Sequence, residues 1–256
     1  MVPAGRHETV LGWLLDLARA DPAISAAAVT GSVARGAGDA WSDVDLFLGV
    51  AAGVPVEQVC DAWTSALYRN LGVLHHFELR AGSAVYRAFL LADLLEVDVG
   101  FTPAHEFGPL GPGDFQVVFG EAAARRPASP PVVDHLVGLG WHHVLHARSA
   151  IERNAPWHAE HWISAVRDQT LVLAALRLGL PTEYATGADR MPQTVTAPLR
   201  DALVRSLDRE ELFRALGAAT GALLAELRIS EPAAAAALAE ALSRLADSRS
   251  WTHGRN

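Results

Sequence analysis

The chain has 256 residues, of which 50% are hydrophobic and 20% are charged, and its formal net charge is −8. This composition supports a sizeable hydrophobic core and excludes a disordered or fibrous chain. Lysine is absent and all 21 basic residues are arginine, which excludes a Walker-type phosphate loop and the attachment of pyridoxal phosphate. The acidic balance argues against a broad nucleic-acid surface, because such surfaces are basic.

Cys60 is the single cysteine, so an intrachain disulfide and a cysteine-cluster zinc site are excluded. Glu8, Asp16 and Arg19 interrupt the apolar residues near the N-terminus, and we therefore expect no signal peptide. No apolar stretch approaches the roughly 20 residues that span a bilayer. These features predict a cytoplasmic protein without membrane contact, and they leave its oligomeric state open.

The first half of the chain alternates between helical and strand patterns. Apolar residues at helical spacing predict a helix over residues 7–20, and a buried strand follows over residues 24–30. Beyond a short helix at Gly31-Ser32, we expect strands over 43–50, 73–80, 85–91, 94–101 and 115–119 and a helix over 55–70. Such a mixture predicts an α+β domain with a mixed sheet of α/β type over residues 1–128.

The second half is almost wholly helical and predicts an all-α helical bundle over residues 129–256. The helices are expected over 132–153, 157–179, 194–206, 208–228 and 232–247, because proline or glycine interrupts the apolar pattern between most of them. Residues 126–131, rich in proline, are the best linker candidate. Trp141, Trp157 and Trp162 are expected in the hydrophobic core of the bundle.

Two short motifs in the first half carry acidic and phosphate-binding chemistry. Gly31-Ser32 follows a strand and opens a helix, which leaves backbone N–H groups free for a phosphate. Asp43 and Asp45 are two residues apart on an expected strand, so both carboxylates lie on one face. Paired carboxylates on a rigid face suit magnesium, which prefers oxygen ligands and shares its coordination shell with substrate phosphates.

A third carboxylate is needed to hold a second metal ion or to act as a base. Asp98 supplies it, on a strand that can pair beside the strand of Asp43 and Asp45. Glu96 lies on the same face as Asp98 and is the reserve candidate. Together these groups predict phosphoryl transfer, in which metal ions bridge phosphates that the backbone holds while an acceptor hydroxyl attacks in line.

The sequence Gly31-Ser32 with Arg35-Gly36, then Ser42-Asp43-Val44-Asp45 and later Asp98, resembles the minimal nucleotidyltransferases of the DNA polymerase β superfamily. The helical second half makes the chain similar to the aminoglycoside and lincosamide nucleotidyltransferase branch. The resemblance implies that Asp43, Asp45 and Asp98 are the catalytic residues and bind two Mg²⁺ ions. It also implies that Gly31 and Ser32 contact the phosphates of ATP, with Arg35 or Ser42 as helpers.

By this resemblance the chain is an adenylyltransferase that transfers AMP from ATP to a hydroxyl of a small molecule, an aminoglycoside- or lincosamide-like antibiotic. Relatives with this layout contact the acceptor through the helical domain, where Glu160 and Asp168 are candidate substrate residues or plain surface charges. The acidic composition favours a cationic acceptor. Two alternatives stay open: an antitoxin-like nucleotidyltransferase that modifies a protein or RNA, and a nucleotide-binding regulator without turnover.

Several purely structural explanations compete with these functional interpretations. Gly31-Ser32 is also compatible with a tight turn and a helix cap. The pairs His142–His146 and His158–His161 have spacings that chelate zinc, but a third ligand is missing from the pattern and packing explains them more simply. The spacing from Arg153 to His158 is also found in helical HEPN ribonucleases, although two fixed positions arise easily by chance.

Overall fold

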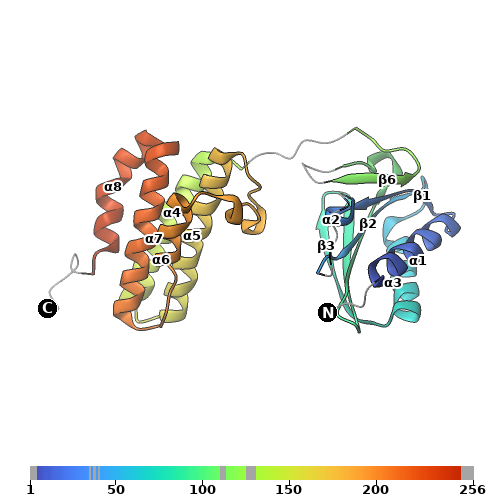
Figure 1. The fold of residues 1–256 in the computed structure, drawn as a ribbon, viewed down its shortest axis with the longest axis horizontal. Helices are drawn as coiled ribbons and strands as arrows, with labels where there is room; N and C mark the ends of the chain where they lie inside the picture. Colours follow the sequence, from blue (N-terminus) through green and yellow to red (C-terminus); the bar gives the residue numbers. More distant parts are fainter. Residues whose placement is uncertain are drawn as a thin grey trace. The chain divides into compact units, whose positions relative to one another are not determined.

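The computed structural model describes residues 5–34, 36, 39, 41–109, 114–124 and 131–248. The chain forms two compact units, Met1–Ser129 and Pro130–Asn256, which run from blue to green and from yellow-green to red in Figure 1. Of the expected linker, residues 126–130 lie outside the described residues.

The N-terminal unit is built on one mixed sheet, in which the described strands are ordered β3-β4-β5-β2-β1-β6. Only β2 and β5 run parallel to each other, and every other neighbouring pair is antiparallel. The strands are β1 Ile24–Thr30, β2 Val44–Val50, β3 Val73–Ala81, β4 Ala84–Leu91, β5 Glu96–Pro103 and β6 Phe115–Phe119. The mixed sheet confirms the predicted α+β class.

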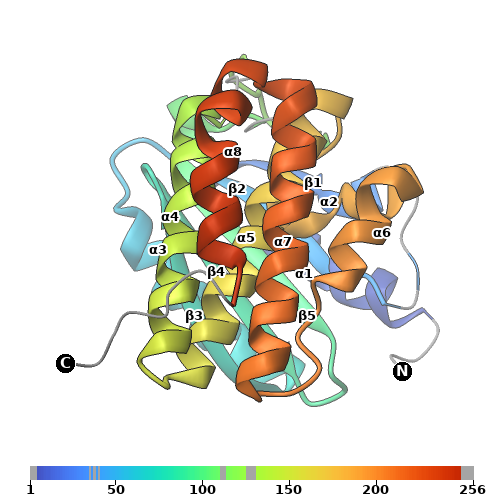
Figure 2. The same cartoon turned by 90° about the vertical axis from the view of Figure 1, so that its left-hand side faces the viewer.

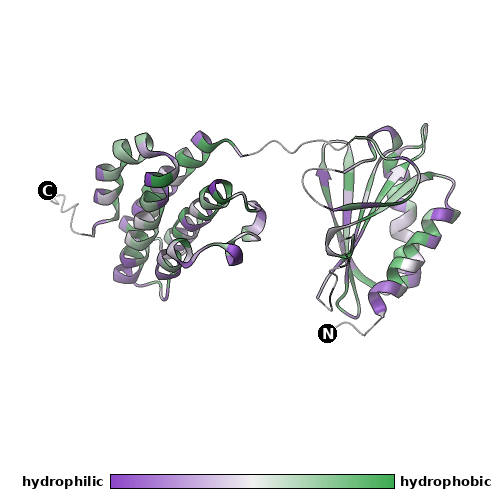
Figure 3. Cartoon of the chain, turned by 45° about the horizontal axis from the view of Figure 1, so that its top comes forward, coloured by the Kyte–Doolittle hydropathy of each residue, from purple (hydrophilic) through white to green (hydrophobic). Residues whose placement is uncertain are grey.

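Two helices, α1 (Arg6–Ala20) and α3 (Val56–Leu71), cover one face of this sheet (Figure 1). Alternate residues of β2, among them Leu46 and Leu48, pack with these helices in the larger hydrophobic core. Trp63 of α3 lies in that core and donates from its indole N–H to Asp21 at 2.9 Å. Hydrophobic residues recur along the strands and helices (Figure 3).

The opposite face of the sheet carries a smaller hydrophobic cluster. Phe47 of β2 packs there against Phe107, which follows the short helix η1 (Ala104–Glu106), and against Phe115 of β6. Asp45 precedes Phe47 by two residues and therefore lies on the same face. A one-turn helix, α2 (Gly31–Ala34), follows β1 directly and contacts β1, β2 and β6. This face carries the candidate site.

The C-terminal unit is all helical, which confirms the second part of the predicted fold class. Its helices are α4 Val133–Glu152, α5 Pro156–Leu178, α6 Gln193–Asp201, α7 Arg209–Ser230 and α8 Pro232–Ala246, with short helices η2 Glu183–Ala185 and η3 Ala188–Arg190. Figure 2 shows α4, α7 and α8 together, and α5 packs on both α4 and α7. Between α5 and α7 a partly buried ion pair joins Arg177 Nε to Glu226 Oε1 at 2.7 Å.

Two expectations for this unit are wrong. Helix α6 ends at Asp201 and not near residue 206, because Arg214 of α7 donates to the carbonyl oxygens of Asp201 and Leu203 and satisfies the chain end. The second concerns the tryptophans: Trp141 and Trp157 are exposed, whereas Trp162 is partly buried. None of the helices in the described ranges is long and apolar enough to cross a bilayer.

Candidate active site

The three predicted aspartates meet on the face of the sheet opposite α1 and α3. Asp45 of β2 and Asp98 of β5 are direct partners in the parallel register, and Asp43 lies one residue before β2, not within the strand as expected. One carboxylate oxygen from each aspartate lies within 4.8 Å of the other two. The predicted pairing of the two acid-bearing strands is therefore present, and it brings three carboxylates to one point.

The three carboxylates are crowded and partly withdrawn from water. Burial and, to a lesser extent, the neighbouring charges of Asp43 and Asp98 together raise the pKa of Asp45 to about 7. Burial also raises the pKa of Asp98 to about 6, with contributions from the charges of Glu96 and Asp43. Close like charges in a half-buried setting disfavour ionisation unless a cation is present.

The part of the chain that the structure describes supplies no cation to this cluster. No arginine or histidine of the described residues forms an ion pair with any of the three aspartates, and Asp98 Oδ1 is buried without a hydrogen-bond partner. A buried acceptor without a partner is costly. Oxygen donors only, concentrated negative charge and an unsatisfied acceptor together fit a hard divalent cation such as Mg²⁺.

Glu96, the reserve candidate, begins β5 and is exposed. It is not part of the three-carboxylate group, but its charge contributes to the raised pKa of both Asp45 and Asp98. The structure thus places Glu96 at the edge of the cluster, where it adds negative potential.

Gly31 lies directly against the aspartates. Its φ of +67° is in the left-handed region, and a Cβ atom built there would overlap the carboxylate of Asp45. Glycine is therefore required at this position both by backbone conformation and by space. The glycine turn predicted to hold phosphates is thereby placed in contact with the predicted metal ligands.

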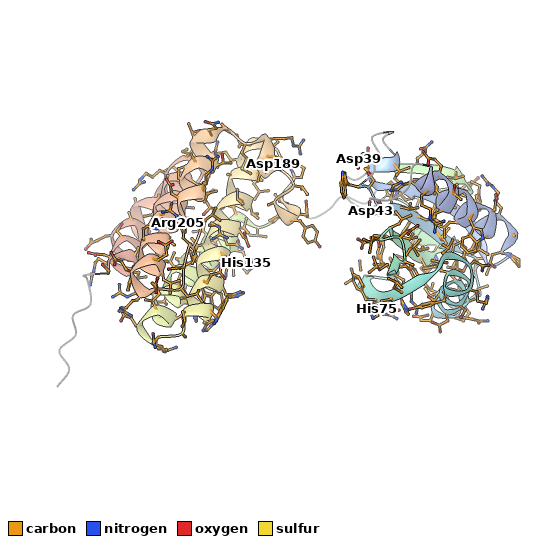
Figure 4. All side chains as sticks on the ribbon, turned by 60° about the horizontal axis from the view of Figure 1, so that its bottom comes forward. Asp39, Asp43, His75, His135, Asp189 and Arg205 are labelled. Atoms are coloured by element: carbon orange, nitrogen blue, oxygen red, sulfur yellow. The ribbon has the colours of Figure 1, made fainter. Side chains whose placement is uncertain are left out.

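Ser32 and Ser42 are brought together by a hydrogen bond of 3.0 Å between their hydroxyl groups. Ser42 Oγ also accepts from the backbone N–H of Asp39 at 2.9 Å, and the Ser42 carbonyl accepts from His7 Nε2 at 2.8 Å. This network fixes the loop before β2, which Figure 4 marks with Asp39 and Asp43. Arg35, the other predicted helper, lies outside the described residues.

A small cavity beside the aspartates was not predicted. It has a volume of about 170 Å³ and adjoins Gly31, and its walls include Phe47, Tyr86 and Phe115. Phe47 and Tyr86 stack with ring centroids 5.6 Å apart, over Gly100, where any Cβ would meet both rings. The period-two pattern of β2 was the signal that could have placed Phe47 beside Asp45 on this face.

The two predicted acceptor residues of the helical unit differ in their surroundings. Asp168 of α5 lines a cavity of about 500 Å³ together with Leu171, Thr182, Tyr184 and Met191. Asp168 has no hydrogen bond or ion pair to any residue that the structure describes. Glu160 does not line this cavity, and its carboxylate accepts a hydrogen bond of 2.6 Å from Ser164.

The histidine pairs pack around one indole. The rings of His142, His146, His158 and His161 all lie within 6.0 Å of the Trp162 ring, between centroids. Within the described ranges, the three aspartates are the one set of three or more such donors gathered within 4.8 Å. The histidine arrangement is therefore an aromatic packing cluster.

No protein-family model matches the sequence, and no curated protein matches it significantly. Among solved structures, the chain is similar to an aminoglycoside 6-adenyltransferase from Bacillus subtilis, at 12% identity and a TM-score of 0.39 over 94% of this chain and 99% of that one. It is also similar to a nucleotidyltransferase-like protein from Exiguobacterium sibiricum, at 11% identity and a TM-score of 0.36 over 89% of this chain and 78% of that one.

Proposed function

We propose that the chain is a magnesium-dependent nucleotidyltransferase that transfers AMP from ATP to a hydroxyl of a small molecule. The observation that carries the proposal is the convergence of Asp43, Asp45 and Asp98 within 4.8 Å beside the turn at Gly31. A cluster of carboxylates that no cation of the described residues balances suits a metal ion, and a glycine turn in contact with it would let a phosphate approach the backbone closely.

Each residue has a distinct role in this proposal. Asp43 and Asp45 would hold Mg²⁺, with Asp98 completing the set and giving room for two ions. Bound Mg²⁺ would neutralise charge on the phosphates and on the departing pyrophosphate. Gly31 and Ser32 would place the triphosphate through backbone N–H groups and a hydroxyl, and Ser42 would orient Ser32 through their hydrogen bond.

Asp98 is the candidate general base for the acceptor hydroxyl. Its strand lies on the side of β2 away from Gly31, so its carboxylate can meet an acceptor that approaches from the side opposite the triphosphate. Oδ1 has no partner in the described part of the chain and is available to accept a proton. A base must lie within hydrogen-bond reach of the proton it takes, so the proposal requires the acceptor hydroxyl to bind next to Asp98.

The acceptor class is proposed as an aminoglycoside- or lincosamide-like compound. Support comes from Asp168, a carboxylate without a partner among the described residues, at a cavity of about 500 Å³, which is within the range of small-molecule pockets. A carboxylate in an otherwise largely apolar cavity suits an amine on a ring-containing compound. Glu160 is the weaker candidate because Ser164 already occupies its carboxylate.

The test is an activity screen on the purified full chain. With ATP, Mg²⁺ and a panel of aminoglycosides and lincosamides, we expect pyrophosphate release and one acceptor heavier by an adenylyl group. Asp43→Asn and Asp45→Asn should keep the circular dichroism spectrum and lose the activity. Asp16→Asn, at a largely exposed carboxylate on α1, is the matched control and should keep full activity.

Other outcomes separate the alternatives. Full activity in both Asp43→Asn and Asp45→Asn would contradict the assignment. Transfer of AMP to protein or RNA substrates, with none to the antibiotics, would replace the small-molecule acceptor by an antitoxin-like role. Binding of ATP without turnover on any acceptor would indicate a regulator.

A further inference from the structure

Trp41 lies in the loop that leads into β2, two residues before Asp43, and its side chain is 78% exposed. Single exposed apolar side chains are common on protein surfaces and carry no meaning by themselves. Trp41 differs because its backbone is anchored: its N–H donates to Asp39 Oδ1 at 2.8 Å, and the next residue, Ser42, is held through both its hydroxyl and its carbonyl. The backbone of Trp41 is therefore anchored two residues before Asp43.

The anchoring ties Trp41 to the phosphate side of the site. The hydrogen bond between Ser32 and Ser42 connects the loop of Trp41 to the turn at Gly31, which directly follows β1. Asp98 lies on β5, on the other side of β2 from β1. The acceptor would thus approach from the side of Asp98 and the triphosphate from the side of Gly31. The loop of Trp41 lies on the side of the triphosphate.

We propose that Trp41 stacks on the base of the bound nucleoside triphosphate. This inference rests on the proposed function, because it needs a nucleotide in the site. Two residues of extended chain span at most about 7 Å, which is comparable to the ribose that separates a base from its α-phosphate. A ligand held at Asp43 by its phosphates therefore brings its base within reach of the indole.

The chemistry of stacking also defines what Trp41 would recognise. Every base has a π face, so stacking on an aromatic side chain tolerates different bases. Trp41 would strengthen the binding of any nucleoside triphosphate and would not by itself select adenine. The aromatic cavity beside Gly31 is a less suitable place for the base, since its volume of about 170 Å³ is below the usual range for ligand pockets and its rings already pack against one another.

The test measures binding to the full chain, without an acceptor, by titration calorimetry in Mg²⁺. Two probes are compared: a non-hydrolysable ATP analogue, and inorganic tripolyphosphate, which has no base. Trp41→Ala should weaken binding of the ATP analogue about 5- to 150-fold and leave tripolyphosphate binding unchanged, and Trp41→Phe should retain most of the affinity. Trp157→Ala removes an indole that is 75% exposed in the helical unit and should change neither.

Each other result overturns the proposal. Unchanged affinity of Trp41→Ala for the ATP analogue excludes stacking, and an equal loss for both probes shows that the substitution distorts the loop. A change confined to the KM for the acceptor would place the indole on the acceptor instead. If the wild-type chain binds neither probe, the proposed function itself fails, and the stacking role fails with it.

Discussion

Replacing one aspartate of the cluster should stabilise the metal-free protein. In Asp45→Asn the amide keeps the size of the carboxyl but cannot ionise. Burial and the charges of Asp43 and Asp98 raise the pKa of Asp45 from 3.8 to about 7 in the folded chain. At about 1.4 kcal/mol per pKa unit, the ionised carboxylate would destabilise the folded state by about 4 kcal/mol in the absence of solvent screening. Asp45 is only partly buried, so we expect screening to leave about 1 to 3 kcal/mol.

The raised pKa of Asp45 determines how stability changes with pH. Because the pKa of Asp45 is higher in the folded than in the unfolded chain, the folded state binds more protons between pH 4 and 7, and stability falls as pH rises through that window. Asp45→Asn should therefore be more stable than the wild type at pH 8 without metal, and the gap should close towards pH 4. With Mg²⁺ the order should reverse, since metal binding stabilises the wild type by mass action.

Urea denaturation in a chelator and in excess Mg²⁺, at pH 5 and pH 8, measures these differences. The transition that responds to Mg²⁺ is assigned to the N-terminal unit, because two units need not unfold together. Asp16→Asn serves as the control and should show neither effect. A metal-free Asp45→Asn no more stable than the wild type at pH 8, or a gap independent of pH, would refute the electrostatic account of the cluster.

Three further predictions concern single side chains. Gly31→Ala should lower the free energy of unfolding by about 1 to 3 kcal/mol and abolish the stabilisation by Mg²⁺ in thermal melts. Gly36→Ala is the control, because Gly36 has the same φ of +67° but open space around it, and it should show the conformational cost alone. Asp168→Asn should raise the KM for an amine-bearing acceptor several-fold in steady-state kinetics with the KM for ATP unchanged; equal effects on both would exclude an acceptor role. Glu226→Gln should destabilise the helical unit by roughly 2 kcal/mol in urea denaturation. This value is below that for a fully buried ion pair, because Arg177 is partly exposed. An unchanged free energy of unfolding would show that the ion pair does not stabilise the unit.

Much of the fold follows from local pattern. The strands over Ile24–Thr30 and Phe115–Phe119 have the predicted bounds, because apolar runs between turn residues define a strand within a few positions. The end of α6 could not be predicted in this way, since Arg214, thirteen residues beyond Asp201, caps its carbonyl oxygen. Exposure of Trp157 was also beyond the sequence, because residue type predicts burial only on average.

Local spacing also predicts part of the candidate site, and the rest depends on the tertiary fold. Spacing of two residues predicts that Asp43 and Asp45 share a face, and the structure brings both to Asp98. That Asp45 and Asp98 are direct partners depends on the parallel register of β2 and β5, which nothing within either strand determines. The contact of Gly31 with Asp45 and the cavity beside it need segments from four strands, so only the folded chain shows them.

The position of the aspartates on paired strands explains how the fold tolerates their repulsion. Charged side chains on a mobile loop would move apart, but the register of β2 with β5 holds Asp45 opposite Asp98, and buried neighbours such as Leu46 and Val97 keep the strands in place. The sheet therefore holds a cluster of negative charge, which a divalent cation would neutralise under the proposed function. Under the proposed function, a site arranged in this way would be ordered before its ligand arrives, so binding energy would be available for positioning the phosphates and not for assembling the carboxylates.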